Sequence, residues 1–162
     1  MRIGDVMTLR PLGPHDREAV TAMHARCSAD SRRMRYFSAA PDLAPRLFDH
    51  FLERSRGYTV VVEDLDGAVI AMAHLMYTVP GAAELAFLVE DAWQGRGLGR
   101  ELAGCLIDLA GAEGLTELTA SVLSDNVRMR RLFTGLGGTT SRGDDPAVLE
   151  ITISLGRVAL AA

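Results

Sequence analysis

Two features of the sequence could carry chemistry: a glycine-rich segment and a carboxylate shortly before it. The segment QGRGLG runs from Gln94 to Gly99, and Glu84 lies in the preceding apolar run AELAFLV. Unpaired N–H groups at the start of a helix attract anions, and glycines let a bulky phosphate approach the backbone closely. Arg96 and Arg100 add positive charge. These residues predict a loop that binds the pyrophosphate of a nucleotide cofactor, with Glu84 performing the chemistry.

The glycine spacing separates this loop from two other phosphate-binding motifs. The dinucleotide fingerprint GxGxxG fails because Arg100 stands where its third glycine belongs. The P-loop fails because no GKS or GKT sequence follows. The remaining pattern is [Gln/Arg]-x-x-Gly-x-[Gly/Ala], matched by Gln94, Gly97 and Gly99. A tight strand-to-helix connection that binds nothing is the alternative interpretation.

The sequence around Glu84 favours a role in proton transfer. Its neighbours Ala83, Leu85 and Ala86 are apolar, and burial among them is expected to raise the pKa of the carboxyl group. A positioned carboxylate can remove a proton from an amine, directly or through one water. The alternative is a solvent-facing residue at the start of a strand, just after a turn at Gly81.

Composition and charge narrow the class of protein. The 162 residues include 48% hydrophobic and 23% charged residues, as is typical of one globular domain. A net charge of −4 gives no electrostatic reason to expect a nucleic acid or an anionic membrane as partner. No apolar run could span a bilayer, and the N-terminus lacks the features of a signal peptide. We therefore expect a cytoplasmic protein with a single domain over residues 1–162.

The cysteines and histidines form no metal or disulfide pattern. Cys27 and Cys105 are too few for a disulfide framework, and neither belongs to a CxxC sequence. A nucleophilic Cys27 would need a histidine partner, and none can be recognised. The four histidines show no HxH or HExxH spacing, so we expect no metal site.

Apolar periodicity predicts the elements that position the loop and Glu84. A strand over 83–89 and a helix over 98–113 flank the loop, and the strand 118–123 must run parallel to 83–89 because a helix joins them. Gly114 has the position of a left-handed helix cap. The other expected strands are 6–12, 58–63, 68–77, 139–142 and 147–155, and the other expected helices are one opened by Gly13 and Pro14, one capped by Ser28 or Asp30, one over 41–54, and one capped by Ser124 or Asp125.

Together these features resemble the GNAT superfamily of N-acetyltransferases. The loop 94–99 is similar to the acetyl-CoA-binding motif of that family, and the segment 126–137, with the pattern NxxMxxLFxxxG, is similar to its second motif. The resemblance covers nearly the whole chain. It implies an α/β fold, a single GNAT domain whose mixed, mostly antiparallel sheet has one parallel splayed pair and flanking helices.

The stretches AELAFLVEDAWQGRGLG and LRPLGPHD…SADSRRMRYF are most similar to the catalytic domain of bacterial protein-lysine acetyltransferases that act on acyl-CoA synthetases. Those enzymes often carry a further regulatory or synthetase-like domain, for which 162 residues leave no room. The resemblance therefore implies a stand-alone catalytic domain.

The same resemblance implies which residues hold acetyl-CoA. Main-chain groups of residues 87–89 would pair with its pantetheine arm, and the Val89 amide would polarise the thioester carbonyl. Loop amides and Arg100 would hold the pyrophosphate, and the Asn126 side chain would contact the cofactor near its reacting end. The full expected set is Phe87, Leu88, Val89, Gln94, Gly95, Arg96, Gly97, Leu98, Gly99, Arg100, Asn126, Met129 and Phe133.

The implied chemistry is direct attack of an amine on acetyl-CoA in a ternary complex. Glu84 matches the position of the proposed general base in the lysine acetyltransferases. Many family members place a tyrosine in the second motif as general acid, but this chain has Phe133, which has no proton to donate. The reaction then needs no general acid, or the acid is a water molecule, or it is one of Ser124, Tyr36 and Tyr77.

The acceptor is less constrained by the sequence. Our first expectation is a protein lysine, for example on an acyl-CoA synthetase; a small amine is the close alternative, and a non-catalytic acyl-CoA-binding sensor is a third. The cluster 32–37 is either a solvated face with two anchoring aromatics or a wall of the acceptor site. His74 lies either behind the active site or in the core. We expect a monomer or a homodimer.

Overall fold

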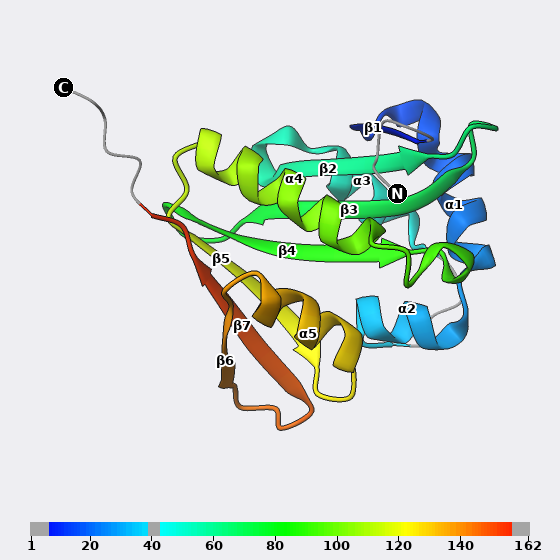
Figure 1. The fold of residues 1–162 in the computed structure, drawn as a ribbon. Coiled ribbons are helices and arrows are strands. Elements are labelled where there is room, and N and C mark those ends of the chain that lie inside the picture. Colours follow the sequence, from blue (N-terminus) through cyan, green and yellow to red (C-terminus); the bar gives the residue numbers. More distant parts are fainter. Residues whose placement is uncertain (1–6, 39–42, 157–162) are drawn as a thin grey trace.

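The computed structural model describes residues 7–38 and 43–156. Its centre is a seven-stranded sheet with the strand order β1-β2-β3-β4-β5-β7-β6, in which only β4 and β5 run parallel (Figure 1). This confirms the predicted mixed, mostly antiparallel sheet and its parallel pair. The strands are β1 (Thr8–Pro11), β2 (Gly57–Glu63), β3 (Val69–Tyr77), β4 (Ala82–Val89), β5 (Glu117–Leu123), β6 (Thr139–Arg142) and β7 (Val148–Ser154).

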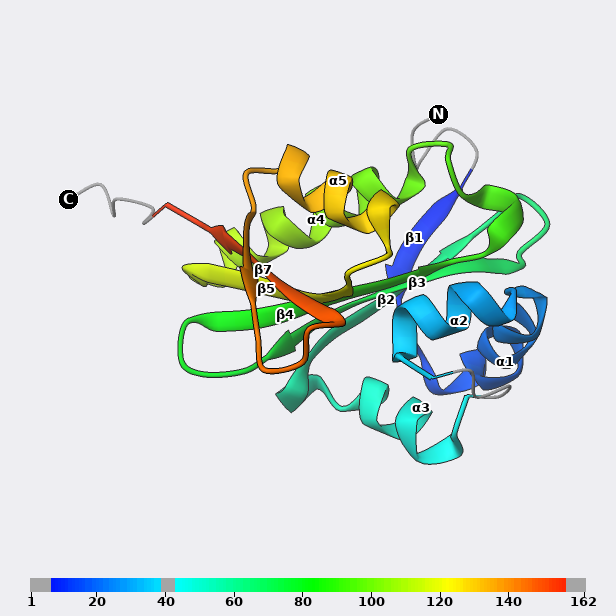
Figure 2. The same cartoon turned by 90° about the horizontal axis from the view of Figure 1, so that it is seen from below.

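Helices cover both faces of the sheet, as Figure 2 shows. One face carries α4 and α5, and the other carries α1, α2 and α3. Each face has its own buried cluster of apolar side chains. The helices are α1 (Arg17–Arg26), α2 (Ala29–Tyr36), α3 (Pro45–Leu52), α4 (Leu98–Ala112) and α5 (Val127–Gly135), with short 3-10 turns at Pro14–Asp16, Arg54–Arg56 and Asp91–Trp93.

The parallel strands β4 and β5 separate soon after they meet. Their register covers only Ala82–Glu84 against Glu117–Thr119, and beyond it the strands splay apart (Figure 1). Within residues 7–38 and 43–156, the second half of β4 therefore pairs with β3 alone. The splay creates an open edge on both β4 and β5, directly beside Glu84.

Side chains of β4 alternate between the two faces, as the pleat of a strand requires. Leu85 and Phe87 are buried with α4 and α5, whereas Leu88 is buried with α1 and α3. Glu84 shares the face of Leu88, and thus faces the side of α1, α2 and α3. Phe133 of α5 packs against Phe87, with ring centroids 5.7 Å apart.

The loop between β4 and α4 is shaped by two glycines. Gly95 and Gly97 have φ angles of 73° and 87°, in the left-handed region that other residues enter only at a cost. Leu98 and Leu102, 3% and 0% exposed, then anchor α4 on the sheet. Burying such a side chain contributes about 1.5–3 kcal/mol. Gly114, with φ 77°, follows the helix as predicted.

Two expected helix starts are wrong by a few residues. The helix predicted from residue 41 begins at Pro45, although residues 41 and 42 lie outside the described ranges. The helix predicted to start at Ser124 or Asp125 has Asn126 as its N-cap, and the Asn126 side-chain oxygen accepts from Met129 N at 3.2 Å. The reason is that the Ser124 N–H donates to Ala147 O at 2.8 Å, which keeps that residue in the strand-end loop. The first strand, expected over 6–12, is seen over Thr8–Pro11, and Val6 is not among the described residues.

Candidate active site

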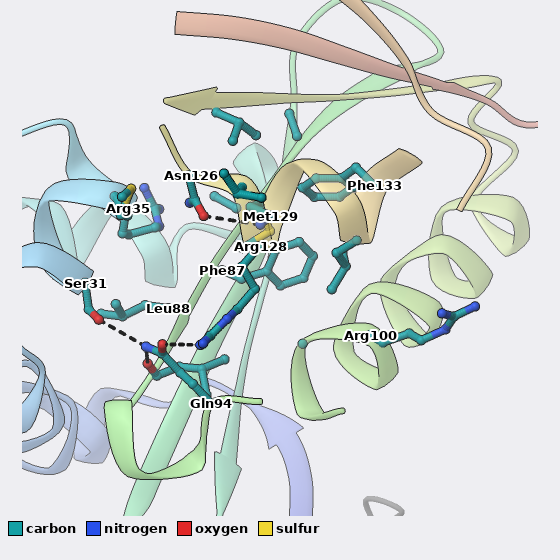
Figure 3. Close-up of a pocket in the computed structure, with 18 of the residues that line it drawn as sticks. Ser31, Arg35, Phe87, Leu88, Gln94, Arg100, Asn126, Arg128, Met129 and Phe133 are labelled. Atoms are coloured by element: carbon teal, nitrogen blue, oxygen red, sulfur yellow. Dashed lines mark hydrogen bonds between the residues drawn. The ribbon is translucent and has the colours of Figure 1, made fainter. Parts of the chain in front are cut away.

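A cavity of about 510 Å³ fills the splay between β4 and β5. Its walls are the open strand edges, the glycine loop, α2 and the first turns of α5 (Figure 3). All but two of the residues predicted to bind a cofactor line it: Phe87, Leu88, Val89, Gln94, Gly95, Gly97, Gly99, Arg100, Asn126, Met129 and Phe133. Residues far apart in the sequence thus converge on one cleft.

The two predicted residues that do not line the cleft have structural contacts instead. Leu98, the first residue of α4, is buried in the core between α4 and the sheet, and the Arg96 guanidinium lies over the Trp93 ring, 5.1 Å from its centroid. Glu84 is also absent from the cleft wall, but its neighbours Leu85 and Ala86 belong to it. The carboxylate therefore stands at the closed end of the splay, on the face toward α2.

The open edge of β4 presents backbone polar groups to the cleft. The Glu90 N–H donates to Ile70 O at 2.9 Å, which places the polar groups of Glu90 toward β3. Because these groups alternate along a strand, those of Val89 and Phe87 point the other way, into the splay. The Val89 carbonyl already accepts from Gln94 Nε2 at 2.9 Å, which leaves its N–H for another partner.

Gln94 joins three walls of the cleft. Its Nε2 donates to Ser31 Oγ at 3.0 Å as well as to Val89 O, and its Oε1 accepts from Arg128 Nη1 at 2.6 Å (Figure 3). The side chain thus connects β4, α2 and α5. Sequence reasoning missed Ser31 and Arg128. They lie 63 and 34 positions from Gln94 in the chain, and no local sequence pattern indicates such long-range contacts.

The start of α4 has the features of an anion site. Gly97 is its N-cap and carries no side chain that could satisfy the first amides of the helix. A helix start concentrates partial positive charge, and Arg100, which lines the cleft, adds a full one. This donor set suits the pyrophosphate of a nucleotide cofactor.

Burial and two charges set the proton affinity of Glu84. The carboxyl group is partly buried, and its desolvation raises the pKa above the ordinary value of 4.5, as the sequence predicted. The positive charge of Arg35, on α2, opposes this shift, and the negative charge of Glu150, on β7, reinforces it. A raised pKa brings the carboxyl group closer to the range of a useful general base.

The three hydroxyl groups considered as general acids do not line the cleft. Tyr36 shares a hydrogen bond of 2.7 Å with His24 Nε2, and burial raises the pKa of Tyr36 to about 12. Tyr77, the last residue of β3, packs edge-on against Tyr58. Ser124 is likewise not part of the cavity wall. Besides Ser31, whose Oγ accepts from Gln94, Ser121 on the open edge of β5 lines the cleft, and sequence reasoning missed it.

The cluster 32–37 divides between two surfaces. Arg35 and the adjacent Met34 line the cleft, as expected if this cluster forms a wall of the acceptor site. Arg32 and Tyr36 instead line a smaller cavity beside α1 and α3. His74 is buried in the core, where its ring lies 3.9 Å from that of Phe51 and its Nδ1 lies 2.9 Å from Thr59 Oγ1. Its Nε2 has no partner among the described residues. Burial holds its pKa well below the ordinary value, so His74 is neutral.

The remaining chemistry-bearing groups give no second centre. Burial raises the pKa of the Cys27 thiol to about 11, which disfavours the thiolate needed by a nucleophile. Within residues 7–38 and 43–156, no three His, Cys, Asp or Glu side chains are grouped so that they could hold a metal ion. In the same ranges no helix is long and apolar enough to cross a membrane.

Comparison with known proteins decides the family. A family model described as an acetyltransferase (GNAT) domain matches residues 7–139. The chain belongs to this family. Acetyltransferase Pat of Mycolicibacterium smegmatis is 34% identical to this GNAT domain over 154 residues, covering 89% of the chain and 44% of that protein. The chain therefore spans less than half the length of this curated relative.

Solved structures share the GNAT fold. The GNAT domain of S. lividans PAT has a TM-score of 0.84 at 26% identity, over 91% of this chain and 89% of that one. The yncA protein of Salmonella typhimurium, whose structure contains its cofactor acetyl-CoA, has a TM-score of 0.76 at 24% identity, over 95% and 96% of the chains. GNAT acetyltransferases use acetyl-CoA as donor, which agrees with the cleft and loop described above. Among the solved structures with this fold is a spermidine N-acetyltransferase from Vibrio cholerae, with a TM-score of 0.74 at 18% identity, over 93% of this chain and 96% of that one.

Proposed function

We propose that residues 1–162 act as one GNAT catalytic domain that transfers the acetyl group of acetyl-CoA to the side-chain amine of a protein lysine. The observation that carries this proposal is the cleft itself. An open strand edge and a helix start with Arg100 line one cavity, and a carboxylate of raised pKa follows at the closed end of the splay, next to the lining residue Leu85. The likeness to the PAT domain and to Pat supports a protein lysine as acceptor. An acyl-CoA synthetase as that protein, a cytoplasmic location and a monomeric or homodimeric state are further predictions.

The residues of the cleft fit acetyl-CoA by their chemistry. Amides of the loop and of α4, with Arg100, would hold the pyrophosphate, and the open edge of β4 would pair with the amide-rich pantetheine arm. The Val89 N–H would donate to the carbonyl oxygen of the thioester. Bound there, the thioester supplies an acetyl carbon open to attack by an amine.

Glu84 performs the proton transfer in this proposal. An ammonium group has no lone pair, so the lysine must lose a proton before its nitrogen can attack. The Glu84 carboxylate accepts that proton, directly or through one water, at the closed end of the splay. As the nitrogen–carbon bond forms, the carbon–sulfur bond breaks and CoA would leave as the thiolate. Phe133 packs on Phe87 and has no proton to donate, so the second proton of the nitrogen would pass to water or to the thiolate.

The test is release of free CoA from acetyl-CoA in the presence of lysine peptides. Glu84→Gln is expected to lower kcat by about 10²–10⁴, the usual contribution of a general base, while acetyl-CoA binding is kept. Glu117→Gln, an exposed carboxylate on β5, is the matched control and should keep full activity. Full activity of Glu84→Gln would contradict the assigned base.

Two other outcomes would change the proposed function. CoA release with small amines but with no peptide would assign a small-molecule acceptor. Tight binding of acetyl-CoA without turnover over a broad panel of amines would assign a sensor, a role that the lack of a hydroxyl at Phe133 favours. In both cases acetyl-CoA should raise the melting temperature, since a ligand that binds only the native state stabilises it.

A further inference from the structure

Arg35 is a half-buried cation on α2. It projects from α2 into the wall of the cleft, on the opposite side from Arg100 (Figure 3). Over the described part of the chain its guanidinium makes no hydrogen bond or ion pair, and its Nε is sealed from solvent with no acceptor. The guanidinium carbon lies 4.5 Å from the centre of the Tyr36 ring. An unpaired cation in such a place is costly, so folding alone does not explain it.

The neighbouring arginines of α2 do find acceptors for their terminal nitrogens, although the Nε of Arg32, like that of Arg35, is buried without a partner among the described residues. Arg33 pairs with Asp30 at 3.1 Å and with Asp125 at 2.8 Å. Arg32 donates through Nη1 to the carbonyls of His24 and Cys27. Arg35 differs from both because its side chain reaches the cleft and finds no acceptor there.

The charges around Arg35 are arranged on the acceptor side of the splay. Glu84 lies on this face of the sheet, and Glu150 joins it because it pairs with Ser121 on β5. Glu84 and Arg35 influence each other electrostatically, yet no ion pair forms between them. The face therefore offers two carboxylates for an ammonium group and, separately, one guanidinium for an anion.

We propose that Arg35 binds a carboxylate carried close to the acceptor amine, so that the preferred acceptor is a lysine with an acidic residue beside it. A guanidinium presents its donors in a planar fork that matches a carboxylate. The acceptor thus brings both charges that the site lacks: an ammonium for Glu84 and Glu150, and an anion for Arg35. The proposal rests on the proposed function and names the acceptor of the same site.

The experiment compares matched lysine peptides in which one neighbour of the lysine is Glu or its isostere Gln, scanned over the flanking positions. Wild-type protein is expected to prefer one Glu peptide over its Gln partner by about ten- to hundredfold in kcat/KM, the range of a charge-assisted hydrogen bond. Arg35→Gln should abolish this preference, and Arg35→Lys should restore part of it. Acetyl-CoA affinity should stay unchanged.

Arg46→Gln is the matched control, because it removes an exposed arginine from α3 on the same side of the sheet. Arg35 also lowers the pKa of Glu84, so the comparison is made at a pH where the rate no longer rises. Absence of any Glu preference in the wild type would overturn the proposal. An equal loss of kcat/KM for both peptides in Arg35→Gln would overturn it as well. It would show that Arg35 has only a structural role or acts only through the pKa of Glu84.

Failure of the lysine acceptor is a separate result. If no peptide is acetylated, the same comparison uses an ω-amino acid and the amine of equal length that lacks the carboxylate. A preference for the amino acid that disappears in Arg35→Gln would support the anion site while rejecting the protein acceptor. Equal rates for the two small amines would reject the anion site too.

Discussion

At the scale of single residues, the site depends on how burial separates similar groups. Glu84 and Glu150 are both carboxylates, but Glu150 is exposed, whereas the Glu84 side chain is partly withdrawn from water at the closed end of the splay, and this burial raises the pKa of Glu84. Arg33 and Arg35 lie on one helix, but only Arg35 reaches the cleft unpaired. Sequence reasoning identified Glu84 from its apolar neighbours. It could not separate the two arginines, because that difference depends on partners far along the chain.

The raised pKa of Glu84 predicts a pH dependence. Only the ionised carboxylate can accept a proton, so kcat/KM should fall as the pH drops through the pKa of Glu84, which lies above the ordinary 4.5. Removing the charge of Arg35 raises that pKa further, so Arg35→Gln should move this limb to higher pH. A second rise at higher pH belongs to the amine itself.

The check is a pH profile of kcat/KM for the wild type, Arg35→Gln and Glu84→Gln. The acidic limb should be present in the first, displaced upward in the second and lost in the third. The same limb in Glu84→Gln would show that another group titrates.

At the scale of elements, the unit formed by β4, the glycine loop, α4 and β5 was predictable from the sequence. This unit is specified by local patterns: a strand of apolar residues, glycines at fixed spacing and a helix with a leucine stripe. Because a helix joins the two strands, β4 and β5 were expected to be parallel. The role of α2 as a cleft wall was left open, because it depends on long-range contacts such as Ser31 with Gln94. The start of α5 was misjudged because Ser124 has a partner in the chain before β7.

The glycine loop yields a prediction with an internal control. Gly97 has φ 87°, where an alanine costs about 1–2 kcal/mol, so Gly97→Ala should turn the first amides of α4 away from the cleft and weaken acetyl-CoA binding by about tenfold. Gly104 lies inside α4 with no atom within 4 Å of an added Cβ. Gly104→Ala should therefore stabilise the protein by about 1 kcal/mol and leave binding unchanged.

Calorimetric titration with acetyl-CoA and thermal unfolding of both variants would measure these effects. Equal affinities for Gly97→Ala and the wild type would mean that the loop geometry is not used for the cofactor.

At the scale of the whole molecule, the sheet separates the residues expected to hold the cofactor phosphates from those expected to bind the acceptor. The face with α4 and α5 carries the anion site of the loop, whereas the face with α1, α2 and α3 carries Glu84 and Arg35. The splay between β4 and β5 opens a passage between the two faces. Donor and acceptor can therefore meet from opposite sides at the end of the paired segment, where Glu84 stands.

The most direct test of this arrangement is a crystal structure of the protein with acetyl-CoA. We expect the pyrophosphate at the start of α4, the pantetheine arm along the open edge of β4, and the thioester carbonyl at the Val89 N–H. The acetyl carbon should face the side of the sheet on which Glu84 and Arg35 lie. Acetyl-CoA bound outside the splay, or a thioester turned toward α4 and away from Glu84, would contradict the account.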